Sequence, residues 1–312
     1  TMKNTIIAVL VIVIVAFLGA GAYLFFRDSS NNNTSTSVMP SDTAAGTVSL
    51  DDAGTSETDG SEKNAASESV IGKSVQGREI IAYHYGSGDT EILFVGGIHG
   101  GYEWNTALLA YKFSDYLKKN PDVIPDNITV TIVPALNPDG LFKVVGVSGP
   151  FTEANVSLSQ DTRISGRFNA NIVDLNRNFD CDWQSAGTWQ NKTVSGGTKA
   201  FSEPESAAIK NYIETKSPAA VLVWYSAAGG VFASSCHNGV LPETSAITSI
   251  YAETSGYPAH ESFDFYEITG DMVNWLAKNK VPAISVLLST HNNIEWDKNL
   301  AGIKALLEHY AK

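Results

Sequence analysis

The sequence of 312 residues predicts one α/β domain with a central mixed, mostly parallel sheet and helices on both faces. Three observations predict this fold. Segments with strand and helix patterns alternate throughout residues 70–312. Two short runs, 219–225 and 283–288, are continuously apolar, as in strands that are buried on both faces. Apolar residues make up 43% of the chain and charged residues 17%, which allows a large core and excludes a wholly disordered protein.

The first half of this domain begins with two apolar runs bounded by glycine, 78–85 and 91–98, which predict strands. Segment 103–119 has apolar residues at helical spacing and ends before Pro121, so it predicts a helix. Segment 128–134 predicts the third strand, because it is apolar and a turn follows it.

The second half continues with segment 203–216, which predicts a helix because Pro204 stands in its first turn. The apolar runs 219–225 and 283–288 are the expected central strands. Two further segments have helical periodicity: 271–280 and 295–310.

The N-terminal part of the chain is of a different kind. Residues 5–26 are 22 consecutive residues without a charge, enough to cross a bilayer as one helix. We therefore expect residues 1–27 to be a single-pass membrane anchor, with the remaining chain on the extracytoplasmic side of the cell membrane. The alternative is a secreted protein whose signal peptide is cleaved at the small residues 20–22. Residues 28–69 predict a disordered acidic linker rich in Ser and Thr, because they contain almost no large apolar side chains.

The net charge of −12 excludes an ordinary nucleic-acid-binding protein, which would normally show a basic face. Much of this charge is local, because the linker contains eight acidic residues and one lysine. The two cysteines are too few for a disulfide scaffold or a cysteine-based zinc site.

Two polar stretches are candidates for the functional site. His99 stands at the end of a predicted strand, and Glu103 opens the next helix after a glycine turn, so both side chains can reach one divalent metal ion. Both positions are also ordinary structural choices for these residue types. The second stretch, 166–179, carries many polar residues between apolar surroundings.

The core of that second stretch, Asp-Leu-Asn-Arg-Asn-Phe at 174–179, resembles the signature of the zinc carboxypeptidases. Further segments are similar to motifs of that family in the same order: 72–78, 97–104, 137–140, 201–205 and 266–275. Together they cover nearly all of residues 70–312. The resemblance implies the family's fold, one zinc ion as cofactor, and peptides with a free C-terminus as partners.

The resemblance also implies roles for single residues. His99 and Glu103 match the first two zinc ligands, although three residues separate them instead of the usual two. Asn176 and Arg177 match the clamp for the peptide carboxylate, which the flap residue Tyr266 completes.

Two more matches concern the reaction and its specificity. Arg167 is the candidate for the arginine that stabilises the oxyanion, and Arg163 is the alternative. Val273 matches the floor of the specificity pocket, which predicts a preference for apolar C-terminal residues.

Two positions depart from the family pattern. Tyr225 stands where the third zinc ligand is a histidine, and a phenol with a pKa near ~10 is a poor ligand at neutral pH. Leu287 stands where the general base is a glutamate, and an alkyl side chain cannot accept a proton. The residues that could substitute are His237, His291, Glu267 and Asp271.

Two function classes follow. The first is a carboxypeptidase-like protein that recognises peptide C-terminal carboxylates with impaired hydrolysis. The second is an active metallocarboxypeptidase that trims peptide or cell-wall peptide C-termini with altered metal ligation.

Cys181 and Cys236 fall on loops near the presumed site, and in an oxidising compartment we expect them to form a disulfide. The alternative is two separate thiols.

Overall fold

The computed structural model describes residues 66–312. The predicted anchor and nearly all of the predicted linker lie outside these residues. No helix in the described part of the chain is long and apolar enough to cross a membrane.

An eight-stranded sheet forms the centre of the domain, with the strand order β1-β2-β4-β3-β7-β10-β8-β9. Parallel pairs join β4 to β3, β3 to β7, β7 to β10 and β8 to β9, and the remaining three neighbours are antiparallel. The mixed, mostly parallel sheet is therefore confirmed. Its strands are β1 (Ser67–Lys73), β2 (Glu79–Gly86), β3 (Thr90–Val95), β4 (Ile128–Val133), β7 (Ala220–Ser226), β8 (Gly230–Ala233), β9 (Ala259–His260) and β10 (Ala283–Leu288).

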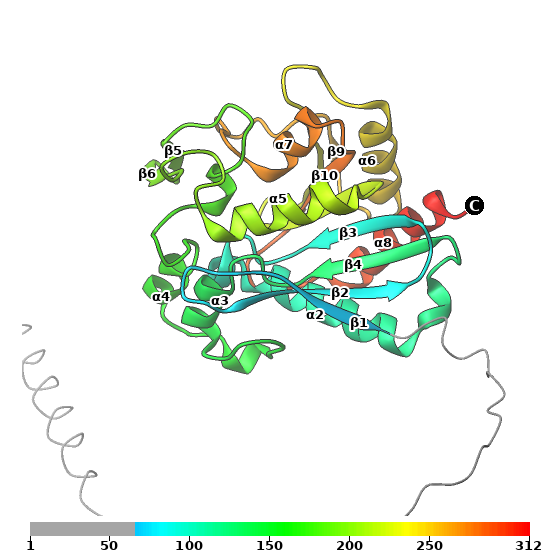
Figure 1. Ribbon diagram of the computed structural model, residues 1–312, viewed down its shortest axis with the longest axis horizontal. Helices are drawn as coiled ribbons and strands as arrows, with labels where there is room; N and C mark the ends of the chain where they lie inside the picture. The colour runs from blue at the N-terminus through cyan, green and yellow to red at the C-terminus, as the bar shows by residue number, and fades with distance from the viewer. Residues whose placement is uncertain (1–65) are drawn as a thin grey trace, which may run out of the picture. The chain divides into compact units, whose positions relative to one another are not determined.

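Helices cover both faces of this sheet, as predicted. They are α2 (Trp104–Lys119), α3 (Pro138–Val145), α4 (Gln160–Ser165), α5 (Pro204–Lys216), α6 (Pro242–Ser255), α7 (Met272–Lys278) and α8 (Trp296–Tyr310). One core cluster packs strand residues such as Phe94 against α2, α6 and α8, and the other packs Leu93 and its neighbours against α5 and α7. The side-chain alternation of a strand sends consecutive residues to opposite faces, which explains the two cores. Figure 1 shows α5 across one face of the sheet.

All nine predicted strands and helices are present, and most of their ends agree to within two residues. The elements that were not predicted are β1, the helices α3, α4 and α6, the short strands β8 and β9, and the separate hairpin of β5 (Ala186–Trp189) and β6 (Lys192–Ser195). β1 is a mostly exposed edge strand, so its sequence lacks the apolar pattern of a core strand. It begins at Ser67, so the folded domain includes the last residues of the predicted linker.

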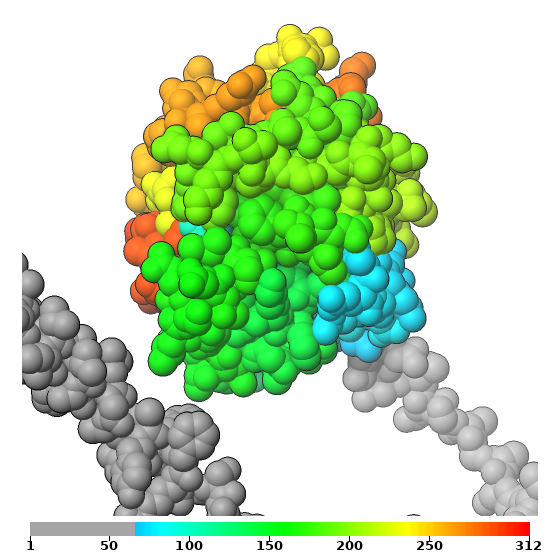
Figure 2. Space-filling model, turned by 90° about the vertical axis from the view of Figure 1, so that its left-hand side faces the viewer, coloured from blue at the N-terminus to red at the C-terminus, as the bar shows by residue number. Residues whose placement is uncertain are grey.

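The parallel strands β3 and β4 end on the left in Figure 1. Figure 2 shows this end of the molecule, where the green residues that follow α3 form much of the surface. In open α/β sheets, ligands bind beyond the carboxyl ends of the strands. The long connection between α3 and α5 therefore covers the end of the sheet at which a site is expected.

Candidate functional site

A cavity of about 350 Å³ opens at this end of the sheet. Most of the residues singled out in the sequence line it: His99, Glu103, Arg167, Asn176, Tyr225, Tyr266, Asp271, Val273, Leu287 and His291. Arg163, Arg177, His237 and Glu267 are not among its lining residues. The fold thus brings together residues from the two polar stretches and from the ends of three strands.

His99 and Glu103 reach the cavity because the chain turns tightly after β3. Gly97 and Gly100 have positive φ angles of 63° and 46°, which glycine adopts without steric cost. Residues Gly100–Glu103 then form a 3₁₀ turn, and His99 Nδ1 lies 2.8 Å from Glu103 Oε1. The additional residue between them is therefore accommodated without separating the two side chains.

Asp174 holds His99 from its other side, with its Oδ1 3.5 Å from His99 Nε2. Arg167 donates two hydrogen bonds, of 3.0 and 2.8 Å, to Asp174 Oδ2, and its Nη1 lies 3.8 Å from Glu103 Oε1. Burial alone would raise the pKa of Asp174, but Arg167 and then His99 hold that pKa well below its usual range. A charged carboxylate here orients the imidazole. Asp174 is the first residue of the motif at 174–179, and no role was predicted for it.

The His99–Glu103 pair fits two ligands of a zinc ion. Both ring nitrogens of His99 are buried and lack a well-formed hydrogen bond within residues 66–312, although Nδ1 faces the Glu103 carboxylate closely. Such a convergent nitrogen and oxygen are the donor types that zinc binds. In the same range of residues, no third His, Cys, Asp or Glu places a ligand atom within 4.8 Å of one ligand atom from each of these two side chains.

Tyr225 lies beside His99, with the two ring centroids 5.6 Å apart. Its hydroxyl donates a hydrogen bond of 3.2 Å to Asn176 Oδ1. Burial, together with the nearby carboxylates of Asp271 and Glu103, raises the pKa of Tyr225 well above its usual value. A neutral phenol that donates to an amide does not offer the ligand that a histidine would offer here.

Leu287 of β10 is the direct neighbour of Tyr225 in the parallel pairing of β10 with β7. It is 8% exposed and lines the cavity with an alkyl group. The two departures from the family pattern therefore lie side by side at the ends of adjacent strands. Neither side chain can act as a general base at neutral pH.

Of the predicted substitutes, His291 is in the cavity and His237 is not. His291 Nδ1 lies 2.8 Å from Ser226 Oγ, and the backbone N–H of Ser226 donates to Glu103 Oε2 at 3.0 Å. His291 is thus linked to Glu103 through one residue. His237 instead pairs with Asp182 at the exposed surface.

Only two of the three residues predicted to bind the peptide carboxylate line the cavity, and the third, Arg177, is buried outside its lining. Asn176 and Tyr266 line the cavity. Arg177 is 1% exposed, and it donates hydrogen bonds to the backbone carbonyls of Asn176 at 2.8 Å and Thr188 at 3.2 Å. Arg177 therefore supports Asn176 from behind, and Arg167 is the arginine that faces the cavity.

Asp271 is the N-cap of α7, where its Oδ1 accepts a hydrogen bond of 3.2 Å from the backbone N–H of Asn274. It is 4% exposed and lines the cavity. Burial raises its pKa to about 6, although the nearby Arg177 opposes this shift.

Asp271→Asn should stabilise the protein at neutral pH. The pKa of Asp271 in the folded state, about 6, exceeds the reference value of 3.8, so the wild type loses stability as pH rises from about 4 to 6. Asparagine caps a helix equally well and carries no charge. The stability of the variant relative to wild type should therefore increase by about 2 kcal/mol between pH 4 and pH 7. Urea unfolding at both pH values measures this, and a pH-independent difference would contradict it.

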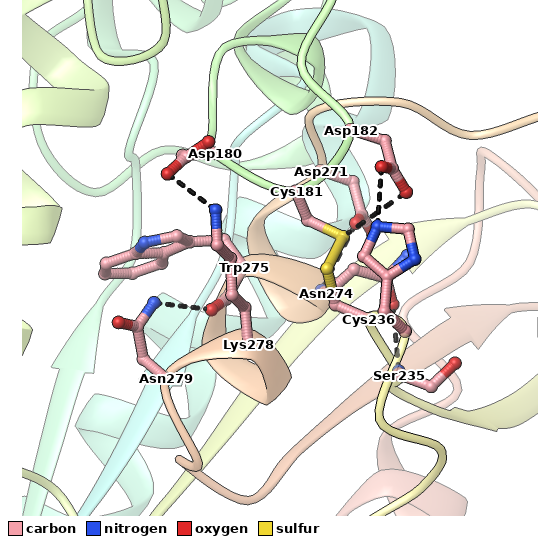
Figure 3. Close-up of a disulfide and its surroundings, with 11 residues drawn as sticks. Asp180, Cys181, Asp182, Ser235, Cys236, Asp271, Asn274, Trp275, Lys278 and Asn279 are labelled. Atoms are coloured by element: carbon pink, nitrogen blue, oxygen red, sulfur yellow. Dashed lines mark hydrogen bonds and ion pairs between the residues drawn. A yellow bond between two sulfur atoms is a disulfide. The ribbon is translucent and has the colours of Figure 1, made fainter.

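A disulfide joins Cys181 to Cys236, as predicted, with their Cα atoms 6.2 Å apart. Figure 3 shows it beside Ser235, Asp271 and Asn274, next to the N-terminus of α7. The nearby Asp182 and the two cysteines are close enough to resemble a metal site, but the sulfur atoms are bonded to each other. The bridge is structural and lies next to the cavity-lining residues Ser235 and Asp271.

A protein-family model described as "Zinc carboxypeptidase" matches residues 55–295, which is most of the chain. The chain belongs to the zinc carboxypeptidase family. Zinc is accordingly the cofactor that the family implies, and His99 and Glu103 are the residues that would hold it.

Two curated metallocarboxypeptidases support this membership. Metallocarboxypeptidase A of Arthroderma otae is 30% identical over 236 residues, which cover 65% of this chain and 53% of that protein. Metallocarboxypeptidase A of Trichophyton rubrum is 36% identical over 131 residues, 38% of this chain and 29% of that protein. The chain thus spans about half or less of the length of these relatives.

Solved structures support the fold. Bovine thrombin-activatable fibrinolysis inhibitor, in complex with tick carboxypeptidase inhibitor, superimposes with a TM-score of 0.60 at 16% identity, covering 78% of this chain and 90% of that chain. The murein-tripeptide amidase of Escherichia coli O157 gives a TM-score of 0.55 at 21% identity, covering 78% and 93%. At these identities the likeness concerns the zinc carboxypeptidase fold alone.

Proposed function

We propose that the chain is a zinc-carboxypeptidase-like protein that binds the C-terminal carboxylate of peptides and has impaired hydrolysis. We further propose that residues 5–26 anchor it in the cell membrane with the domain on the extracytoplasmic side. The adjacent Tyr225 and Leu287 carry the proposal of impairment. Zinc, when bound in this family, polarises the scissile carbonyl and activates water, but a base must also take up the proton.

Carboxylate binding is supported by the side chain of Asn176. Its Oδ1 accepts hydrogen bonds from the Tyr225 hydroxyl and from the backbone N–H of Met272, both at 3.2 Å. These two donors fix the orientation of the amide, so its Nδ2 group is left to donate toward a ligand. Arg167 and Tyr266 line the same cavity, and their side chains carry a positive charge and a hydroxyl donor.

Carboxylate recognition predicts that the full chain binds a short peptide at least about tenfold more tightly than the same peptide with a C-terminal amide. Isothermal titration calorimetry measures both affinities. Tyr266→Phe should weaken binding of the acid and leave the amide unchanged. The control is Tyr111→Phe, which removes a hydroxyl outside the cavity and should change neither affinity. Equal affinity of the wild type for acid and amide would contradict the proposal.

The second candidate is an active peptidase with altered metal ligation, acting on peptides or cell-wall peptides. The convergence of His99 and Glu103, with His291 linked to Glu103 through Ser226, favours it. Stoichiometric zinc in the purified chain, together with rapid hydrolysis of blocked dipeptides, would favour this function over the first. Zinc-free protein without turnover would exclude it.

A further inference from the structure

We propose that Trp189 of the β5–β6 hairpin is a positioning residue, which holds the Arg167 guanidinium so that it receives the carboxylate of a peptide ligand. This inference deepens the proposed function and rests on it, because it names the cation that recognises the carboxylate and the residue that orients this cation. The hairpin is separate from the main sheet (Figure 1), and its residues Trp189 and Gln190 line the cavity.

The guanidinium of Arg167 is held at one end and open at the other. Its Nε and Nη2 both donate to Asp174 Oδ2, at 3.0 and 2.8 Å. Nη1 donates no hydrogen bond to another group within residues 66–312, and it is not one of the fully buried atoms that lack a partner there. Since Arg167 lines the cavity, Nη1 is the part of the guanidinium that can donate to a ligand.

The ring of Trp189 covers this guanidinium. Arg167 Cζ lies 4.5 Å from the centroid of the Trp189 ring, in the range of a cation–π contact, and 5.8 Å from that of Tyr102. Trp189 is 6% exposed, so this contact is shielded from solvent. A planar cation that stacks on a ring face loses freedom to rotate, and the two bonds to Asp174 then fix the direction of Nη1.

This orientation matters because a second carboxylate lies close to Nη1. Glu103 Oε1 is 3.8 Å away, and both side chains are almost fully buried. A modest rotation of the guanidinium would turn this distance into a charge-assisted hydrogen bond, and the group that is open to a ligand would then be occupied. Trp189 therefore maintains the orientation in which the positive charge of Arg167 is available to a ligand.

The hairpin is held on both sides of Trp189. Arg177, which is buried outside the cavity lining, donates a hydrogen bond of 3.2 Å to the backbone carbonyl of Thr188. On the other side, Gln190 Nε2 donates to the Tyr102 hydroxyl at 2.9 Å. The two sequence neighbours of Trp189 thus have fixed contacts, and these contacts fix the position of its ring.

The test measures the affinities of acetyl-Ala-Ala-Leu and of its C-terminal amide for the full chain by isothermal titration calorimetry at pH 7.5. Trp189→Met removes the aromatic face but keeps an apolar side chain of adaptable shape. We expect it to lower the acid-over-amide affinity ratio about fivefold or more, and to leave the affinity for the amide within about twofold. Trp189→Phe retains an aromatic face and should retain most of the ratio.

The ratio separates positioning from a purely structural role, since a damaged cavity would weaken the binding of acid and amide alike. The control is Thr193→Ala, which changes an exposed residue of the same hairpin outside the cavity lining and should change neither affinity. Circular dichroism verifies the fold of each variant. Trp189→Leu provides the same comparison if Trp189→Met does not fold.

Three results would overturn the inference: a ratio that Trp189→Met leaves unchanged, an equal loss of affinity for acid and amide, or a ratio that falls as far in Trp189→Phe as in Trp189→Met. The wild-type ratio keeps this test apart from that of the proposed function. A wild type without preference for the acid contradicts carboxylate recognition itself. A wild-type preference that persists in Trp189→Met contradicts only the role of Trp189.

Discussion

Combining Tyr225→His with Leu287→Glu is expected to raise peptide hydrolysis by at least about 10²–10⁴-fold over the wild-type protein with zinc present. The histidine would provide the third protein ligand beside His99 and Glu103, and leave one position open. The glutamate would provide the proton acceptor that Leu287 cannot be. Each single variant should remain nearly inactive, because Tyr225→His alone lacks the proton acceptor and Leu287→Glu alone lacks the third zinc ligand.

The positions of these two residues favour the result. Both are on parallel strands that end at the cavity, and they are neighbours in the register of β7 and β10. Their side chains are 6% and 8% exposed and line the same space. A histidine at 225 would start next to His99, whose ring centroid is now 5.6 Å from that of Tyr225. The substitutions therefore introduce the new groups where the existing ligands already converge.

The assay compares wild type, both single variants and the double variant, with zinc content measured for each. High activity of the wild type would contradict impaired hydrolysis. A folded, zinc-loaded double variant without activity would contradict the restoration. The cause would then lie in the extra residue between His99 and Glu103, or Leu287 would not be the residue that matches the glutamate position of the family.

The central strands and the longer helices could be predicted from the sequence, because buried strands and amphipathic helices have strong apolar patterns. β1 and β8 could not be found in this way. β1 is an exposed edge strand, and β8 has four residues whose pairing partners, β10 and β9, are distant in sequence. Such strands are defined by the partners they meet in the fold and not by their own periodicity.

The sequence motifs correctly predicted those site residues whose side chains lie together in the cavity. His99, Glu103 and Asn176 do so because glycine turns and a short 3₁₀ segment fix their directions. The position of Arg177 behind Asn176 could not be predicted, since adjacent residues of a turn point in different directions. Asp271 was expected only as a possible substitute base, and the packing of α7, which it caps, is what places it in the cavity lining.

Replacing both Cys181 and Cys236 with alanine is expected to destabilise the domain by about 4 kcal/mol. The bridge closes a loop of 55 residues, and the chain-entropy model gives this magnitude for such a loop. The free energy of unfolding in urea measures the loss. The control is Lys278→Ala, which removes the exposed 2.8 Å ion pair with Asp180 in the same region and should cost less than about 1 kcal/mol.

The double alanine variant should also bind peptides less tightly, because the bridge joins segments that form the cavity wall. The carbonyl of Cys181 accepts a 2.7 Å hydrogen bond from the backbone N–H of Gly270, directly before Asp271. On the other side of the bridge, the backbone N–H of Ser235 donates to the Asn274 side chain at 3.1 Å. Losing the bridge lets these segments separate, and the N-terminus of α7 lies between them. Unchanged stability together with unchanged peptide affinity would show that packing alone holds this wall, and would contradict the prediction.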